Sequence, residues 1–161
     1  MQKITTFLWF DGNAEEAINY YVSIFKNARV LYLRRWPDGM GKDGEVLTGS
    51  FEIHGQQFNA LNGGPQYKFT PAISLFVDCK DQAEVDELWE KLSEGGHKDR
   101  CGWLTDKFGL SWQIIPTTLS QLIGDPDPAK ASRVMQAMMK MDKIDIKKLE
   151  EAAEETQFVE S

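Results

Sequence analysis

The sequence predicts an α+β fold in which a strand, a helix and three strands occur in that order twice, followed by helices. Hydrophobic residues alternate with polar ones along several short runs, as they do in strands with one buried face. In two other stretches they recur at helical spacing, and the order of the elements repeats with a period of roughly 65 to 70 residues. After Pro116 the pattern becomes helical. We therefore expect two βαβββ modules and a helical extension.

The domain boundaries follow from this repeat. Each module has a sheet that cannot bury one of its faces alone, so the two modules should pack as a pair over residues 1–116. The expected division is at about 1–66 and 67–116, and the extension covers 117–161. The extension either packs on the core or forms a dimer contact.

The first module begins with an apolar strand at residues 4–10 and a turn at 11–13 that can cap the following helix. That helix is expected at 14–25. The remaining strands of this module are expected at 30–36, 47–53 and 57–62. A glycine-rich loop at 37–44 leads into a strand, so no helix N-terminus follows it to bind a phosphate.

The second module repeats the order, with a strand at 72–79 and a helix at 82–93 that ends at Gly95 and Gly96. A short strand at 98–101 and a β-hairpin at 101–116 complete it. The hairpin turns at residues 106–109, where Gly109 can adopt a positive φ. Gln113 is a polar residue in the middle of its apolar return strand. Its amide needs partners, supplied either by neighbouring backbone or by a ligand or water in a pocket.

The extension contains three expected helices. Thr117 or Thr118 can cap the first, Asp127 the second and Asp145 the last, and the segment TQFVES at 156–161 is expected to fray. The second helix carries a broad apolar stripe rich in methionine, which is adaptable in packing. This stripe either covers one end of the core or meets a second copy in a homodimer.

The composition excludes some classes of function. With 42% hydrophobic and 27% charged residues, the 161-residue chain can bury an ordinary core. Its net charge of −7 and pI of about 4.9 oppose nonspecific binding to nucleic acids and anionic membranes, which needs a basic surface. Since no run resembles a signal peptide or a membrane span, we expect a cytoplasmic protein.

Side chains of the common catalytic sites are sparse. The two histidines, His54 and His97, lie in an expected turn and loop and are more typical of exposed residues than of metal ligands. Cys79 and Cys101 fall in predicted strand regions, where thiols usually pack as small apolar groups, and a disulfide between them remains open. No G-x-S-x-G motif indicates a nucleophilic serine.

Four segments carry a family resemblance. They are FDGNAEEAINYY at 10–21, AISLFVDCKDQAEVDELWEKLSEGG at 72–96, CGWLTDKFGLSWQIIP at 101–116 and RVMQAMMKMDKIDIKKLEEA at 133–152. Together they resemble the vicinal oxygen chelate superfamily, which has the glyoxalase/bleomycin-resistance fold. The resemblance is greatest to its PhnB-like group, whose members often carry the name 3-demethylubiquinone-9 3-methyltransferase. It implies two βαβββ modules that form a cup-shaped sheet around a site.

In metal-dependent members of the superfamily, ligands come from the first and last strands of each module. The resemblance puts Thr6, Ala72 and Gln113 at three of these positions, with the fourth near residues 59–62. Alanine has no donor atom, and the other two side chains are neutral. The resemblance therefore implies a pocket without a metal or another cofactor.

The favoured function is binding of a small, partly aromatic or apolar molecule by a homodimer, with an unknown reaction. The pocket residues, chosen from strand parity and resemblance with Gln113 as hydrogen-bonding anchor, are Phe10, Ser74, Phe76, Trp103 and Gln113. The alternative is an enzyme, either the named methyltransferase or a glyoxalase or dioxygenase relative. S-adenosylmethionine usually binds at a glycine loop between a strand and a helix, which neither module offers.

Overall fold

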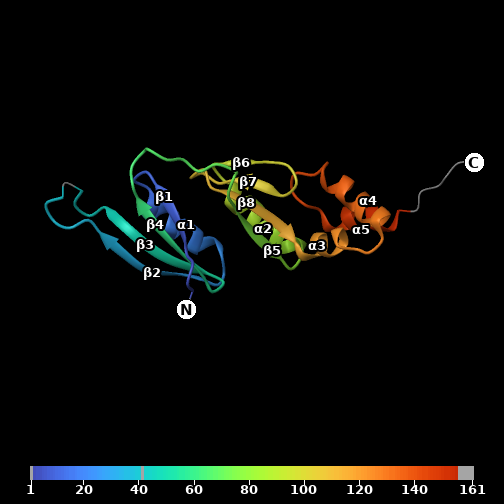
Figure 1. Ribbon diagram of the computed structural model, residues 1–161, viewed down its shortest axis with the longest axis horizontal. Coiled ribbons are helices and arrows are strands. Elements are labelled where there is room, and N and C mark those ends of the chain that lie inside the picture. Colours follow the sequence, from blue (N-terminus) through green and yellow to red (C-terminus); the bar gives the residue numbers. More distant parts are fainter. Residues whose placement is uncertain (1, 41, 156–161) are drawn as a thin grey trace, which may run out of the picture. The chain divides into compact units, whose positions relative to one another are not determined.

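The computed structural model describes residues 2–40 and 42–155 and confirms the α+β class (Figure 1). Within these residues the chain forms two four-stranded sheets and five α-helices. It divides into two compact units, Met1–Phe69 and Thr70–Ser161, each with one sheet. The segment TQFVES lies outside the described residues. The helices within the described residues are too short or too polar to span a bilayer.

The first unit has the predicted order of one strand, one helix and three strands (Figure 1). Its elements are β1 Thr6–Phe10, α1 Ala14–Ile24, β2 Ala28–Arg35, β3 Val46–Ile53 and β4 Gln56–Asn62. The strands lie in the order β1-β4-β3-β2, with β1 parallel to β4 and the other pairs antiparallel. The glycine-rich loop joins β2 to β3, and no helix follows it.

Helix α1 packs on one face of this sheet because its apolar side chains recur at helical spacing. Tyr21 is fully buried and stacks on Phe51 at 5.9 Å between ring centroids, and Phe51 stacks on Phe58 at 5.3 Å. Gly49 permits the close approach of the helix, since a Cβ there would lie 2.6 Å from Cδ1 of Ile18. These contacts fix which face of the first sheet is covered.

The cap of α1 differs from the prediction. The side chain of Asn13 makes no capping hydrogen bond. Instead, Oδ1 of Asn62 on β4 accepts a hydrogen bond of 2.9 Å from the backbone N–H of Ala14, and its Nδ2 donates to the Val46 carbonyl at 2.8 Å. A buried amide from the sheet therefore satisfies a free donor at the helix start.

The second unit repeats this order and adds three helices (Figure 1). Its first elements are β5 Ser74–Cys79, α2 Gln82–Ser93, β6 His97–Lys98, β7 Trp103–Thr105 and β8 Ser111–Pro116. The added helices are α3 Thr117–Ile123, α4 Pro128–Met138 and α5 Ile146–Glu154. The sheet order β5-β8-β7-β6 and the parallel β5–β8 pair match the arrangement in the first unit.

The short strand predicted at 98–101 is smaller and shifted, because the chain turns sharply before β7. Cys101 has a φ of 62° and Gly102 a φ of 81°, so neither residue continues a strand. A Cβ at position 102 would also lie 2.7 Å from Cδ1 of Ile115. His97, expected in a loop, lies in β6, and its exposed Nε2 is 3.4 Å from Oδ2 of Asp99.

The C-terminal helices share an apolar cluster with the end of β8. Its buried members are Ile115, Leu119, Val134, Ile144, Leu149 and Ala153. Asp127 and Asp145 cap α4 and α5 as predicted, whereas α3 begins without a side-chain cap. Thr117 instead donates its hydroxyl to Oδ1 of Asp78 at 2.8 Å.

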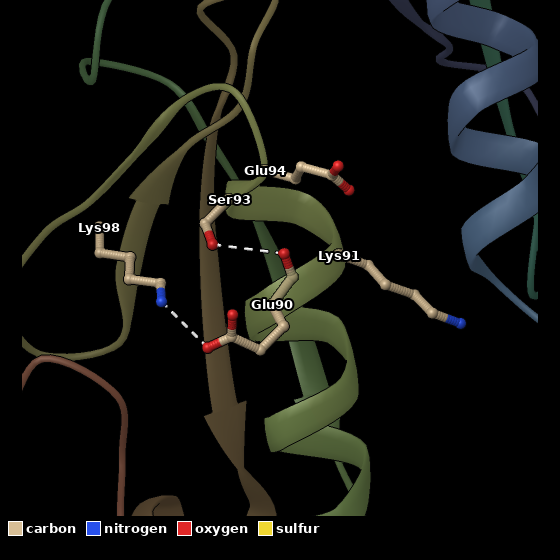
Figure 2. Close-up of a pocket in the computed structure, with 5 residues that line it drawn as sticks. All are labelled: Glu90, Lys91, Ser93, Glu94 and Lys98. Carbon is tan, nitrogen blue, oxygen red and sulfur yellow. Dashed lines mark hydrogen bonds and ion pairs between the residues drawn. The ribbon is translucent and has the colours of Figure 1, made fainter.

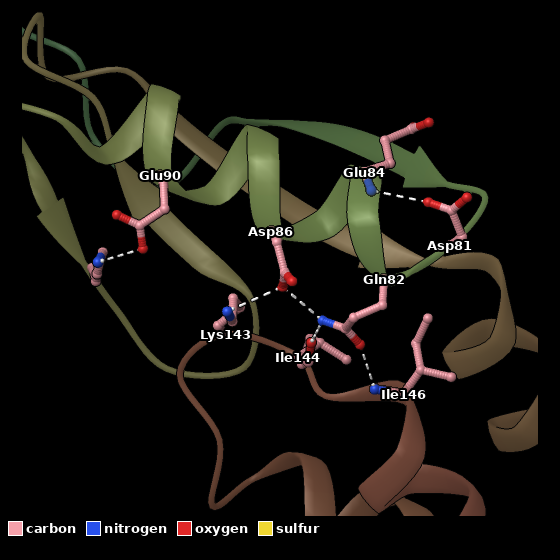
Figure 3. A network of polar contacts seen from close by, with 9 residues as sticks. Asp81, Gln82, Glu84, Asp86, Glu90, Lys143, Ile144 and Ile146 are labelled. Atoms are coloured by element: carbon pink, nitrogen blue, oxygen red, sulfur yellow. Dashed lines mark hydrogen bonds and ion pairs between the residues drawn. The ribbon is translucent and has the colours of Figure 1, made fainter.

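A polar latch joins α2 to the chain before α5 (Figure 3). Nε2 of Gln82 donates to the Ile144 carbonyl at 2.9 Å, and its Oε1 accepts from the Ile146 N–H at 2.8 Å. Gln82 also donates to Asp86, which pairs with Lys143 at 3.0 Å. The extension is thus held on the second unit by both apolar packing and this latch.

Candidate functional site

One face of the second sheet carries most of the residues singled out from the sequence. Residues paired across neighbouring strands project on the same face of a sheet. The pairing places Phe76, Gln113 and Trp103 in one row and Ser74, Ser111 and Thr105 in the next. We call these six positions the open face of the second sheet. On the opposite face, Leu104, Trp112 and Ile114 are almost completely buried, on the side where α2 packs.

Gln113 occupies the centre of this open face. Its side chain is half-buried, and Nε2 donates a 2.9 Å hydrogen bond to Oγ of Ser74. No partner of its Oε1 is present among the described residues. The amide is therefore held by one neighbour and retains an acceptor for another molecule.

Ser111 was not singled out from the sequence, although it has the same strand parity as Gln113. Its side chain is 1% exposed, and its Oγ has no hydrogen-bond partner among the described residues. Leaving a buried hydroxyl without a partner costs about 1–3 kcal/mol, so such atoms are rare. This hydroxyl lies in the row next to Gln113 and adds a second unsatisfied polar group to the open face.

Other residues of the same hairpin are explained by the fold alone. The buried carboxylate of Asp106 accepts hydrogen bonds from the N–H of Phe108 at 2.8 Å and of Leu110 at 3.1 Å. Its second oxygen accepts from Nε1 of Trp112 at 2.9 Å. Gly109, with a φ of 90°, completes the turn as predicted. Asp106, Gly109 and Trp112 therefore build the hairpin, whereas Ser111 and Gln113 retain unused hydrogen-bonding capacity.

Phe10 belongs to the first unit, whereas the other four predicted pocket residues belong to the second. It pairs with Asn62, is 3% exposed and contacts the edge of Phe69, with 5.3 Å between ring centroids. Strand parity places Phe10 and Thr6 on the α1 side of the first sheet and Phe7 on the other side. Ala72 precedes β5. The structure thus brings Ser74, Phe76, Trp103 and Gln113 to one sheet face, but not Phe10.

The first sheet repeats the geometry around Gln113. Asn59 of β4 is flanked by Phe7 and Ser50, as Gln113 of β8 is flanked by Phe76 and Trp103. This assignment fixes the strand register that the sequence left open at residues 59–62. Each unit therefore has a neutral amide at the middle of its fourth strand.

The usual signs of metal or thiol chemistry do not occur in the described residues. No three side chains among their histidines, cysteines, aspartates and glutamates are grouped so that they could hold a metal ion. Cys79 and Cys101 are both free thiols, which settles the question of a disulfide. Burial raises the pKa of the Cys79 thiol to about 12, so this group is protonated and a poor nucleophile at neutral pH.

A shallow depression lies elsewhere, at the C-terminal end of α2 (Figure 2). It has a volume of about 380 Å³ and is lined by Glu90, Lys91, Ser93, Glu94 and Lys98. Lys98 pairs with Glu90 at 3.0 Å, and Lys91 pairs with Glu87 at 2.7 Å. Because both lysines already have carboxylate partners, we assign this depression no function.

Comparisons with known proteins place the chain in a family. Residues 2–115 match the model of the 3-demethylubiquinone-9 3-methyltransferase family. A PhnB protein from Bacillus cereus, to which the same methyltransferase name is provisionally applied, is 37% identical, with a TM-score of 0.68. The match covers 72% of this chain and 100% of that one. The comparison with curated proteins gave no match.

Two other solved structures are more distant. Protein PA1353 from Pseudomonas aeruginosa is 19% identical, with a TM-score of 0.59 and coverage of 72% of this chain and 98% of that one. The fosfomycin resistance protein FosX from Listeria monocytogenes, solved with Mn(II) and sulfate, is 17% identical, with a TM-score of 0.49. That match covers 70% of this chain and 90% of FosX.

The two βαβββ units have the glyoxalase/bleomycin-resistance-like fold that the sequence predicted. The family match spans most of the chain, and the Bacillus cereus protein is matched over its full length. This chain therefore belongs to the 3-demethylubiquinone-9 3-methyltransferase-like (PhnB) family.

Proposed function

We propose that this protein binds a small, partly apolar molecule on the open face of the second sheet, without a metal ion. The observation that carries the proposal is the buried Oγ of Ser111, which has no partner and lies in the row next to Gln113. A ligand with a hydrogen-bonding group satisfies both side chains and removes the penalty of the unpaired hydroxyl.

The neighbouring side chains indicate the rest of the ligand. Phe76 is 54% exposed, which is unusual for a large apolar side chain, and Trp103 is half-buried on the opposite side of Gln113. Apolar walls around a few polar groups are typical of sites for small molecules. A planar apolar body that contacts the two rings and directs a hydroxyl or amide towards Gln113 fits this arrangement.

The chemistry of the donor set supports a site without a metal. Ser74, Ser111 and Gln113 are neutral, and divalent cations in proteins are usually held by carboxylates, imidazoles or thiolates. The sheet face therefore offers hydrogen bonds and apolar contact, but no anionic ligand at these three positions.

We do not assign methyl transfer to the chain on the basis of the family name. The glycine-rich loop after β2 leads into β3 of the same antiparallel pair. It therefore lacks the strand-loop-helix geometry in which glycine loops usually hold nucleotide-like cofactors.

The proposal also includes a homodimer in the cytoplasm. Phe7 and Phe76 lie in different sheets, each on the face that no helix of its unit covers. Their side chains are 55% and 54% exposed. Large exposed aromatic side chains commonly mark binding or association surfaces. A second copy that covers either of these side chains lowers its exposure to water.

The test of the binding site is a fragment screen followed by substitution of Gln113. Uncharged aromatic amides and alcohols are screened by thermal shift, and the affinity of the best fragment is measured by calorimetry. We expect Gln113→Ala to weaken binding by about three- to tenfold, the effect of losing one hydrogen bond. Gln121→Ala, at an exposed glutamine of α3, is the control and should leave the affinity unchanged. Equal affinities of the wild type and Gln113→Ala would remove Gln113 from the site.

A further inference from the structure

We propose that the C-terminal extension positions Trp103 for ligand binding on the open face of the second sheet. The inference rests on the function proposed for that face and names the part of the fold that adjusts it. The segment at residues 139–145 joins α4 to α5, and we call it the strap. It lies beyond the family match, which ends at residue 115, yet it is bonded to the turn directly before Trp103.

Two backbone hydrogen bonds join the strap to this turn. The carbonyl of Met141 accepts from the N–H of Cys101 at 2.8 Å. The carbonyl of Asp142 accepts from the N–H of Gly102, also at 2.8 Å. Apolar packing reinforces them, because Ile144 is fully buried and a Cβ at position 102 would lie 3.1 Å from its Cγ1. Two adjacent residues of the turn are thus held by a segment about 40 positions further along the chain.

The turn depends on this support because its backbone conformation is unfavourable. Cys101 has a φ of 62°, in the left-handed region that residues with a side chain rarely adopt, and Gly102 follows with a φ of 81°. Such a conformation persists where the surrounding contacts determine it. Without the strap, both N–H groups lose their partners and Cys101 is free to relax to a negative φ.

The turn sets the position of Trp103 at the start of β7. This strand has only three residues, so few hydrogen bonds of its own align it. The carbonyl of Trp103 accepts from the N–H of Asp99 at 2.9 Å, within the turn. The carbonyl of Gly102 accepts from the N–H of Ile114 at 2.8 Å, next to the pair formed by Trp103 and Gln113. A shift of the turn therefore moves the indole relative to the amide of Gln113.

The latch fastens the strap to α2 (Figure 3). Gln82 donates to the carbonyl of Ile144 in the strap and accepts from the N–H of Ile146 at the start of α5. Helix α2 packs on the side of the sheet opposite the open face. A substitution of Gln82 therefore loosens the strap without changing any side chain of the candidate site.

The first measurement needs no ligand and compares two glutamine variants of the full-length protein. Gln82→Ala removes both bonds of the latch to the backbone, and Gln136→Ala, at an exposed glutamine of α4, is the matched control. The indole signal of Trp103, assigned with Trp103→Phe, is recorded by NMR for each protein. We expect this signal to shift or broaden in Gln82→Ala and to stay unchanged in Gln136→Ala. An unchanged signal in Gln82→Ala would overturn the proposal.

Hydrogen exchange locates the change within the unit. The N–H groups of Cys101 and Gly102 should exchange about tenfold faster in Gln82→Ala, the effect of losing about one hydrogen bond. The N–H of Leu110, which donates to the buried carboxylate of Asp106, is the reference and should keep its rate. Equal acceleration at all three groups means that the whole unit is destabilised, which would contradict a specific role of the strap.

A binding measurement then tests the coupling to the candidate site. The probe is 2-naphthamide, an uncharged aromatic amide, and its affinity is measured by calorimetry. We expect Gln82→Ala to bind it about threefold more weakly than the wild type, and Gln136→Ala to bind it equally well. Equal affinities of the wild type and Gln82→Ala would show that the strap does not adjust the site. If neither 2-naphthamide nor a screened fragment binds while the Trp103 signal changes as expected, the proposed function fails and the hold of the strap on Trp103 stands.

Discussion

At the scale of single residues, the hairpin from Cys101 to Pro116 contains two kinds of polar side chain. Some use their hydrogen bonds to hold the fold, and others keep hydrogen-bonding atoms that a ligand can use. Asp106 uses both carboxylate oxygens to hold the turn and the indole of Trp112. Gln113 and Ser111, on the return strand, keep an acceptor and a hydroxyl without partners. The same short segment thus stabilises the second unit and provides the polar centre of its candidate site.

The role of Asp106 leads to a prediction on stability. In Asp106→Asn, one oxygen still accepts from the turn, but an amide N–H replaces the acceptor for the Trp112 indole. We expect the free energy of unfolding to fall by about 1–3 kcal/mol, measured by urea denaturation. Asp99→Asn, at an exposed aspartate, should change it by less than about 0.5 kcal/mol. If the two variants are equally stable, the hairpin does not depend on the buried carboxylate.

The residues also show how far the sequence could specify the site. The turn at Gly109 and the unusual polar position of Gln113 follow from local patterns, and both lie where predicted. The unpaired state of Ser111 depends on what surrounds it in three dimensions, so alternation alone could not reveal it. Phe10 was predicted to line the pocket, and its place on the α1 side of the first sheet could not be derived for a related reason: both faces of the first strand are aromatic, and which face is covered depends on the packing of α1.

At the scale of elements, local signals predicted the helices better than their caps. Asp127 and Asp145 cap their own helices because the acceptor and the donor are close in sequence. The donor at the start of α1 is satisfied by Asn62, which is 48 residues away in the chain. Likewise, the latch between α2 and the segment before α5 joins residues more than 60 positions apart. Such partners arise from tertiary packing, which no local pattern encodes.

We expect the latch to make the attachment of the C-terminal segment dependent on pH, because it contains the carboxylate of Asp86. The hydrogen bond from Gln82, followed by the interaction with Lys143, holds the pKa of Asp86 below its ordinary value of 3.8. A carboxyl group with a lowered pKa in the folded state stabilises that state above its unfolded pKa. This contribution is lost as the pH falls through the lower pKa of the folded state.

We therefore expect Asp86→Asn to lower the Tm of the protein at pH 6 and to have a smaller effect near pH 3. The measurement is thermal unfolding of the wild type and the variant across this range. Because the Asp86 side chain is 47% exposed, water screens its charge and the shift at pH 6 should be small, within a few degrees. Asp43→Asn, in the loop between β2 and β3, is the control for removing one negative charge outside the latch. A difference between Asp86→Asn and the wild type that persists unchanged at pH 3 would contradict the role of the Asp86 charge.

At the scale of the whole molecule, the internal repeat made the fold predictable. Two modules with the same order of elements restrict the possible topologies, and both sheets have the expected strand order. The family match ends at residue 115, whereas α3, α4 and α5 follow it. These helices pack on the second unit through Ile115 and the latch, so they are an addition to the matched region with its own stabilising contacts.

The proposed homodimer belongs to this scale as well. We expect sedimentation equilibrium at micromolar concentrations to give about twice the mass of the 18.3 kDa chain. If Phe76 contributes to the apolar area that a second copy shields, Phe76→Ser should weaken the association. Lys80→Ser, at an exposed residue just after β5, is the control for a change of surface composition. A chain that remains monomeric at all concentrations would contradict this proposal.

The central claim is that Gln113 and Ser111 bind a small molecule without a metal. The most direct measurement is calorimetry of the best uncharged aromatic fragment against the wild type and Ser111→Ala, Gln113→Ala protein, each after treatment with a chelator. We predict that the wild type binds equally well before and after chelation, and that the double variant binds at least tenfold more weakly. Binding that disappears on chelation and returns with a divalent metal, or equal affinities of the two proteins, would contradict the claim.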